Sequence, residues 1–299
     1  MVKTGSAAFI LSSLLCLMSP SSFAEDRPVT AKPGAVSFSV GTFELTSLRD
    51  SGYVLSASGG DFGADAGPAA VKKLLADAHA PTDEIRLDVD ALLVRMPGHL
   101  VLLDTGLGPK SSGALPGSLK LAGTTPAAIT DVLITHAHED HVGGLVTADG
   151  KSAFPNARIR MSSREWTFLK SQFPAGSKLL ASQIVTFEPG AEILPGITPI
   201  ALYGHTPGHV AYEIVSGAQR IEDIGDAAHS SIISLAKPDW VGEMDQDSKN
   251  AAVVRAKEVA RLAKAHELVF APHFPFPGVG WIVPKGDGYA WMPDTGVGR

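Results

Sequence analysis

Several apolar runs in this chain end abruptly in a histidine or an aspartate, and this pattern constrains the fold more than any other feature. The run DVLIT at 131–135 leads directly into HAHEDH at 136–141, HLVLL ends at Asp104, and LVFAP ends at His273. Short apolar runs of this kind are typical of buried strands. Because open α/β sheets place ligand sites beyond the carboxyl ends of their strands, we expect these polar side chains to meet at one edge.

The rest of the chain predicts strands interleaved with a few helices. A strand pair is expected at 36–48, a strand–turn–strand unit at 90–106, helices at 67–79, 163–172 and 247–265, and further strands at 127–135, 157–161, 197–203, 210–215, 220–225 and 267–273. The segments 51–65 and 107–123 are rich in small residues, and we expect them to be loops where substrate choice is made. This order predicts an α/β fold with two sheets and helices outside.

Composition excludes several classes of protein. The chain has 299 residues, of which 44% are hydrophobic and 19% charged, so it is able to bury a large core. Its net charge is −6 at pH 7 and its basic residues form no run, which argues against nucleic acid as a partner. We therefore expect a small-molecule substrate and no nucleic acid.

The N-terminal segment resembles a signal peptide. It contains Lys3, an apolar stretch from Ala7 to Met18, and a small-x-small site that ends at Ala24. The apolar stretch is too short to span a bilayer as a helix. We therefore expect removal of residues 1–24, a single domain over 25–299, and export to the periplasm or the medium without a membrane anchor. Cys16, the only cysteine, lies in the removed segment, so thiolate ligands and disulfides are not expected.

The segment HAHEDH carries the strongest chemical signal. In an extended segment, His136 and His138 leave the same face of the chain, so both imidazoles reach one ion. Asp140 and His141 follow as the chain turns and are able to serve a second ion. The alternative interpretation is a solvated, histidine-rich loop.

Two ions need more ligands than this segment supplies. The further candidates all lie beside predicted strands: His209 in GHTPGH, Asp226 after RIEDIG, and His273 in APH. Together the candidates offer five imidazoles and two carboxylates. This set suits zinc better than calcium or magnesium, which prefer oxygen ligands only.

The motifs THAHEDHVGG, GHTPGH, GD at 225–226, APH at 271–273 and DTG at 104–106 resemble those of metallo-β-lactamase-fold hydrolases. The segments GDAAH and APHFPFPGVGWIVPKGDGYAWMP are most similar to the methyl parathion hydrolase type of that superfamily. The resemblance implies a four-layer αβ/βα sandwich. It also implies that His136, His138 and His209 hold one zinc, that Asp140, His141 and His273 hold the other, and that Asp226 bridges them.

The resemblance further implies an exported enzyme with two Zn²⁺ per chain that cleaves small esters, lactones or organophosphate triesters. Coordination lowers the pKa of water from about 15.7 to about 7, so a hydroxide shared by two ions would serve as the nucleophile. Enzymes that hydrolyse β-lactams usually lack the bridging aspartate, which makes that activity the second hypothesis. A non-catalytic metal-binding module and a glyoxalase-like thioester hydrolase are further alternatives. Relatives are often dimers, so a homodimer is also a hypothesis.

Other residues have two interpretations each. Asp140 beside the nucleophile is expected to orient it and pass its proton to the leaving group. His229 either donates to the substrate or packs, and Asp104 either accepts a ring N–H of a ligand histidine or forms an Asx turn. His205 is expected to be a structural hydrogen-bonding residue. The candidate pocket walls are Trp166, Phe168, Phe274, Phe276 and Trp281, of which Phe274 and Phe276 are expected to face the site, whereas Trp166 and Phe168 are expected to pack on the core.

Overall fold

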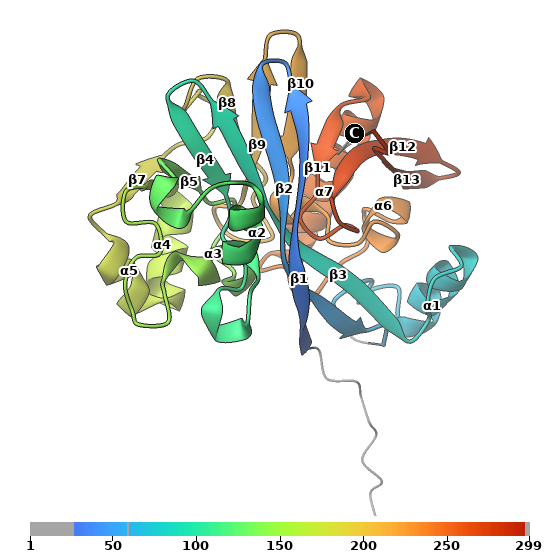
Figure 1. The fold of residues 1–299 in the computed structure, drawn as a ribbon. Coiled ribbons are helices and arrows are strands. Elements are labelled where there is room, and N and C mark those ends of the chain that lie inside the picture. The colour runs from blue at the N-terminus through green and yellow to red at the C-terminus, as the bar shows by residue number, and fades with distance from the viewer. Residues whose placement is uncertain (1–26, 59, 297–299) are drawn as a thin grey trace, which may run out of the picture.

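The fold is two β-sheets that face each other, with helices on both outer sides (Figure 1). The structure, a computed structural model, describes residues 27–58 and 60–296. The expected signal peptide and its cleavage site lie outside the described residues. The arrangement is the metallo-β-lactamase sandwich that the motifs implied.

The first sheet has seven strands in sequential order. They are β1 (Arg27–Val40), β2 (Phe43–Ser56), β3 (Glu84–Met96), β4 (His99–Leu103), β5 (Asp131–Leu133), β6 (Arg158–Ser162) and β7 (Ile184–Phe187). Strands β1 to β4 pair antiparallel, whereas β4 to β7 pair parallel. The parallel half therefore directs the carboxyl ends of β4 and β5 toward the same edge.

The second sheet has six strands in the order β13-β12-β11-β10-β9-β8. They are β8 (Ile197–Ala201), β9 (Val210–Ser216), β10 (Gln219–Asp223), β11 (Leu268–Phe270), β12 (Val279–Lys285) and β13 (Gly288–Pro293). Only β10 and β11 pair parallel. Two segments about 45 residues apart in sequence, which follow β10 and β11, are thus placed side by side.

The helices divide into groups by the sheet they cover. They are α1 (Pro68–Asp77), α2 (Leu115–Leu121), α3 (Glu139–Val142), α4 (Ser163–Gln172), α5 (Pro174–Leu180), α6 (Ile233–Ala236) and α7 (Ser248–Ala265). Leucines of α2, α4 and α5 are buried in the core outside the first sheet, and α7 packs its apolar face against the second sheet. Asp247 begins α7 by accepting a hydrogen bond from the backbone N–H of Asn250 at 3.2 Å, a standard N-cap.

Three apolar cores separate the four layers. One lies between the sheets and includes Leu45, Tyr212 and Phe270, and the other two lie beneath the outer helices. A smaller cluster, which includes Leu55, Phe62 and Trp240, packs α1 and the far ends of β2 and β3 beside α6. Such close-packed layers hold the strand ends rigidly, which fixes the positions of the residues that follow them.

Several elements differ from those expected. The strand pair expected at 36–48 is longer, because β2 continues to Ser56 and thereby uses much of the expected loop 51–65. The expected loop 107–123 contains α2, which Leu115 and Leu119 anchor in the core. The C-terminal hairpin β12–β13 was not expected at all. Its aromatic residues alternate too irregularly for a period of two to be recognised.

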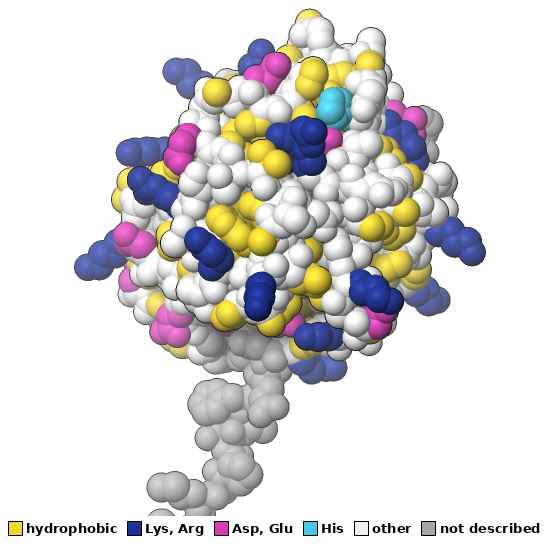
Figure 2. All heavy atoms as spheres, turned by 90° about the vertical axis from the view of Figure 1, so that its left-hand side faces the viewer, with side chains coloured by type: hydrophobic (Ala, Val, Ile, Leu, Met, Phe, Trp, Pro, Cys, Tyr) yellow, Lys and Arg dark blue, Asp and Glu magenta, His cyan; other side chains and the backbone are white. Residues whose placement is uncertain are grey.

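The outer surface near α4, α5 and β7 carries charges of both signs around small apolar patches (Figure 2). Within 27–58 and 60–296, every helix is too short or too polar to cross a bilayer. The polar outer faces agree with helices that bury only their inner stripe.

A buried carboxylate between β10 and α7 predicts how stability responds to pH. Arg261 of α7 forms ion pairs with Glu222, Glu258 and Glu267, and Glu222 is fully buried. Burial, reinforced by Glu258, raises the pKa of Glu222 to about 9, against 4.5 in the unfolded chain. Between these values the folded protein keeps a proton that the unfolded chain releases, so stability falls as the pH rises from about 5 to about 9.

We therefore expect Glu222→Gln to flatten this decline and to raise the free energy of unfolding at pH 9 by on the order of 2 kcal/mol. Denaturant unfolding at pH 5, 7 and 9, at constant metal content, measures the effect. Glu213, the neighbour of Glu222 on β9, pairs with Arg220 near the surface, so Glu213→Gln is the matched control. Equal pH profiles for Glu222→Gln and the parent protein would contradict the prediction.

Candidate metal centre

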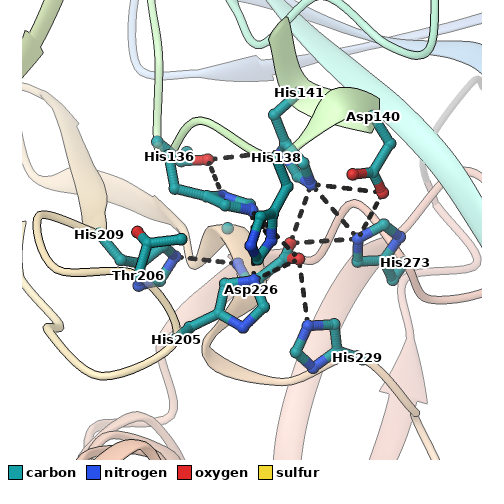
Figure 3. Close-up of polar contacts among 12 residues, drawn as sticks. His136, His138, Asp140, His141, His205, Thr206, His209, Asp226, His229 and His273 are labelled. Atoms are coloured by element: carbon teal, nitrogen blue, oxygen red, sulfur yellow. Dashed lines mark hydrogen bonds and ion pairs between the residues drawn. The ribbon is translucent and has the colours of Figure 1, made fainter. Parts of the chain in front are cut away.

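The segment HAHEDH changes conformation halfway, and this change divides its side chains between two groups. After β5 the chain leaves the sheet, the backbone of His138 is extended, and α3 then begins at Glu139. His136 and His138 leave the extended part together, whereas the helical turn directs Asp140 and His141 toward His273 (Figure 3). The sequence predicted that His136 and His138 would share a face and that the chain would turn at Asp140 and His141, and the structure has both features.

The first group consists of His136, His138, His205 and Asp226, whose ligand atoms all lie within 4.8 Å of one another. The Nε2 atom of His136 lies 3.1 Å from Nδ1 of His138 and 3.2 Å from Nε2 of His205. Oδ2 of Asp226 lies 3.2 Å from Nε2 of His205 and 3.5 Å from Nε2 of His136. Three imidazoles and a carboxylate oxygen therefore converge on one point.

The second group consists of Asp140, His141 and His273. Oδ2 of Asp140 lies 3.7 Å from Nε2 of His141 and 3.5 Å from Nε2 of His273. The other oxygen of Asp226, Oδ1, lies 3.1 Å from Nε2 of each of these histidines. Asp226 therefore presents one oxygen to each group, the arrangement of a bridging carboxylate.

The loops after β10 and β8 bring Asp226 and His205 into place. Gly225 has a φ of 47°, and a Cβ on it would lie 2.7 Å from Nε2 of His209 and 3.0 Å from Cβ of Thr135. Only glycine fits this close approach without strain. The chain is thereby able to turn sharply after β10 and direct the carboxylate of Asp226 between the two groups.

His209, expected as a ligand of the first ion, does not belong to either group. Its Nδ1–H donates to the carbonyl of Leu202 at 3.0 Å, and its Nε2 accepts from the backbone N–H of Asp226 at 3.0 Å. Both ring nitrogens are thus used by the backbone. His205, expected to be structural, occupies the ligand position instead. The sequence prediction for these two residues was wrong, and His209 supports Asp226 from behind.

Three of the imidazoles that face the centre have their other nitrogen held by an acceptor. Nδ1 of His205 lies 2.8 Å from Oδ1 of Asp245, Nδ1 of His141 lies 2.7 Å from Oδ2 of Asp104, and Nδ1 of His273 lies 2.7 Å from the carbonyl of Asp88. Such partners fix the tautomer and the orientation of a ligand histidine. Of the two interpretations of Asp104, the structure places its carboxylate on the ring N–H of His141.

Glu165, in the first turn of α4, joins the two loops that carry histidines of the first group. It is fully buried, and its carboxylate accepts from the N–H of Ala137 at 2.6 Å, the hydroxyl of Thr206 at 2.8 Å and the N–H of Gly208 at 2.9 Å. Sequence reasoning missed this residue, because an acidic residue at a helix start is also an ordinary surface feature. Its three donors explain how a charge is accommodated there.

The chemistry of the donor set fits a cation. Burial lowers the pKa of His138 to about 3, so its imidazole is neutral and has a free lone pair. Burial opposes ionisation of Asp226, but the surrounding histidines outweigh it and hold its pKa well below the usual range. Oδ1 of Asp226 is buried and has no hydrogen-bond donor among the described residues. A buried, ionised acceptor of this kind is explained by a bound metal ion.

The cavity over the centre has a volume of about 180 Å³. Its apolar walls are Tyr53, Leu55, Leu87 and Met244. The expected walls lie elsewhere: Phe274 is fully buried behind the second sheet, Arg49 lies over the ring of Phe276, and Trp281 stacks on His266. Trp166 and Phe168 pack, as expected, against the core between the first sheet and its outer helices. Phe168 also contacts the ring of His138.

His229 lies at the side of the cavity, three residues after Asp226. Its Nε2 is 3.1 Å from Oδ2 of Asp226, and its ring stacks on that of His273 at 5.6 Å. It also lines the cavity over the centre, so a substrate there would lie within its reach. The contact with Phe62 shows that the ring packs as well.

The Asp104 contact gives a direct prediction. Asp104→Asn presents an N–H₂ group to a ring N–H and weakens the fixed orientation of His141. We expect metal affinity to fall about 10- to 100-fold, the usual loss for such partners. Competition with a chromophoric chelator measures the affinity. Asp131→Asn is the matched control, because Asp131 accepts from His99 near the surface and far from the centre. Equal metal affinities for Asp104→Asn and this control would contradict the prediction.

Comparison with known proteins agrees with the fold and the centre. The sequence model described as the Metallo-beta-lactamase superfamily matches residues 85–273, which hold all the residues of both groups. The chain therefore belongs to the metallo-β-lactamase superfamily.

Two solved structures are more than 25% identical in sequence to this chain. One is AidC, a dizinc quorum-quenching lactonase in complex with its product N-hexanoyl-L-homoserine, at 29% identity and a TM-score of 0.81, covering 88% of this chain and 98% of that one. The other is the hydrolase AbOPH of the β-lactamase superfamily, at 28% identity and a TM-score of 0.79, with the same coverage of both chains. Both likenesses agree with the superfamily match and with the fold described above.

Two curated relatives match shorter stretches. The uncharacterized protein YobT of Bacillus subtilis (strain 168) is 27% identical over 139 residues, which cover 42% of this chain and 56% of that protein. Metallo-beta-lactamase domain-containing protein 1 of Xenopus laevis is 33% identical over 132 residues, which cover 43% of this chain and 49% of that protein. The chain thus spans about half the length of these relatives.

Proposed function

We propose that this protein is a dinuclear zinc hydrolase that cleaves small esters and lactones. The observation that carries the proposal is the placement of Asp226, whose two oxygens face two separate groups of imidazoles. Nitrogen-rich donor sets with carboxylates favour zinc over magnesium or calcium. Two zinc ions held there would supply an activated water and polarise the acceptor oxygen of the substrate.

The chain's own residues then have distinct roles. Asp140 is half-buried at the cavity side of the second group, where its carboxylate is able to take a proton from the attacking water and return it to the leaving oxygen. His229 borders the same cavity and is placed to donate a hydrogen bond to the substrate. Tyr53, Leu55, Leu87 and Met244 exclude bulk water, which strengthens these polar contacts.

The carbonyl substrates are favoured by the likeness to AidC, whose product is an acyl-homoserine. The phosphorus of an organophosphate triester is also an electrophile that an activated water is able to attack, and methyl parathion hydrolase-like activity is a further part of the proposal. We also propose that the protein acts after export, as its N-terminal segment suggests.

Metal removal tests this function. We expect dialysis against a chelator to lower hydrolysis more than a hundredfold, and about two equivalents of Zn²⁺ to restore it, because coordination to zinc is what lowers the pKa of the attacking water. Metal content is measured by plasma emission spectrometry. Rates are measured on a homoserine lactone, an aryl ester, a phosphotriester and a β-lactam.

The panel also distinguishes the alternatives. Fastest turnover of the lactone or the ester supports the proposal, whereas fastest turnover of the β-lactam replaces it by that activity. Two bound metals without hydrolysis of any compound would contradict the proposal and indicate a metal-binding module.

A further inference from the structure

Tyr53 of β2 lines the cavity over the metal centre, and the protein leaves its hydroxyl group unused. The side chain is half-buried. Leu55, two positions further along the same face of β2, lines the same cavity, as does Leu87, which lies opposite Tyr53 on β3. Within the described parts of the chain, the phenol hydroxyl has no hydrogen-bond partner. A hydroxyl group that borders a substrate cavity in this way is available to a ligand.

The hydroxyl of Tyr53 lies on the side of the cavity where Asp140 lies. Burial raises the pKa of Tyr53 above its usual range, and among the nearby charges that of Asp140 raises it more than that of Asp226. Asp226 is the more deeply buried of these two carboxylates, so its weaker effect indicates a longer distance from the hydroxyl. The raised pKa also means that the phenol keeps its proton and remains a donor.

The position beside Asp140 determines which substrate oxygen the hydroxyl meets. In the function proposed above, Asp140 returns a proton to the leaving oxygen, so this oxygen comes within reach of its carboxylate. A donor on the same side of the cavity therefore faces the leaving oxygen. An alkoxide leaving group carries a concentrated negative charge and gains much from such a donor, whereas nitrophenolate spreads its charge over the ring and gains little.

We propose that the hydroxyl of Tyr53 donates a hydrogen bond to the leaving oxygen of the substrate and so adapts the site to lactones and alkyl esters, whose leaving group is an alkoxide. This inference rests on the proposed function, because it assumes that the reacting carbonyl lies at the metal centre. The oxygen of water bonds to the carbonyl carbon, and the bond from that carbon to the leaving oxygen breaks. The proton that Asp140 takes from the water passes to the leaving oxygen, and Tyr53 keeps its own proton throughout.

The test uses Tyr53→Phe, which removes only the hydroxyl, and Tyr289→Phe as the matched control. Tyr289 of β13 is also half-buried but lies outside the cavity. The kcat and KM values of the zinc-loaded proteins are measured on γ-butyrolactone, ethyl butyrate and p-nitrophenyl butyrate. Binding of γ-hydroxybutyrate and of butyrate is measured separately by calorimetry. The hydroxyl of γ-hydroxybutyrate is the former leaving oxygen of the lactone, so this comparison tests the contact without turnover.

We expect Tyr53→Phe to lose about 10- to 100-fold in kcat on the lactone and the ethyl ester, the usual loss for one hydrogen bond to a developing charge, but less than about threefold on the p-nitrophenyl ester. Zinc content and the unfolding midpoint should not change, because the hydroxyl has no partner within the protein. The parent protein and Tyr289→Phe should bind γ-hydroxybutyrate several-fold more tightly than butyrate, and Tyr53→Phe should bind both equally.

Two results would overturn the inference. One is an equal change in kcat on the alkyl and the aryl substrates, and the other is a preference for γ-hydroxybutyrate that is absent from the parent protein or survives in Tyr53→Phe. A preference that only Tyr53→Phe abolishes, in proteins that hydrolyse none of the three substrates, would support the contact and contradict the proposed function.

Discussion

Replacing Asp226 by alanine is expected to remove hydrolysis and bound metal together. Each oxygen of this carboxylate faces one group of imidazoles, so alanine takes a ligand from both at once. Loss of a partner outside the ligand sphere already costs about 10- to 100-fold, and loss of a shared ligand should cost more than about a hundredfold in kcat/KM. Metal analysis after gel filtration and rates on the preferred substrate measure the two effects.

Asp226→Asn gives a graded control. Asparagine keeps one oxygen of similar position but replaces the other by an N–H₂ group, which does not bind a cation. We expect it to keep metal in one group only and to remain folded. A fully active Asp226→Ala protein with two bound metals would contradict the bridging role.

Alanine substitutions at His205 and His209 are expected to have different effects, the first on metal binding and activity and the second on stability. His205→Ala is expected to lower bound metal by about one equivalent and to reduce activity more than about a hundredfold, because the first group then has two imidazoles. Asp245 keeps its contact with Arg255 in this variant, so the metal-free fold should change little. Metal content and the unfolding midpoint of metal-free protein measure the two effects.

His209→Ala should instead act on stability. It leaves the backbone N–H of Asp226 and the carbonyl of Leu202 unpaired in a buried region, which should cost about 2–4 kcal/mol. Metal content should fall less than in His205→Ala. The opposite pattern, with His209→Ala losing metal and His205→Ala only losing stability, would restore the prediction made from the sequence.

The predicted residues that the structure brings together are those whose placement depends on local geometry. The extended His136–His138 segment and the turn before His141 follow from a run of six residues, and spacing along the chain settles which side chains share a face. Asp226 and His273 follow buried strands, and parallel pairing of β10 with β11 brings them to one edge. The four-layer fold was equally accessible, because the motifs that imply it extend over most of the chain.

The residues that were assigned wrongly depended on how loops and layers pack. GHTPGH offers two histidines four positions apart, and nothing in the spacing tells which ring faces the cavity. Only the path of the loop turns His205 inward and leaves His209 behind Asp226. Phe274 likewise follows a ligand closely in sequence, yet its side chain enters the core behind the second sheet.

The kinds of ligand at the centre are thus predictable from the amino-acid sequence, because residue types and strand ends are local properties. Tertiary packing sets which histidine completes the first group, which side chains form the cavity, and how Glu165 joins two loops more than sixty residues apart. These contacts arise between distant segments. Their geometry is set by the packing of two sheets against each other, which no single stretch of sequence encodes.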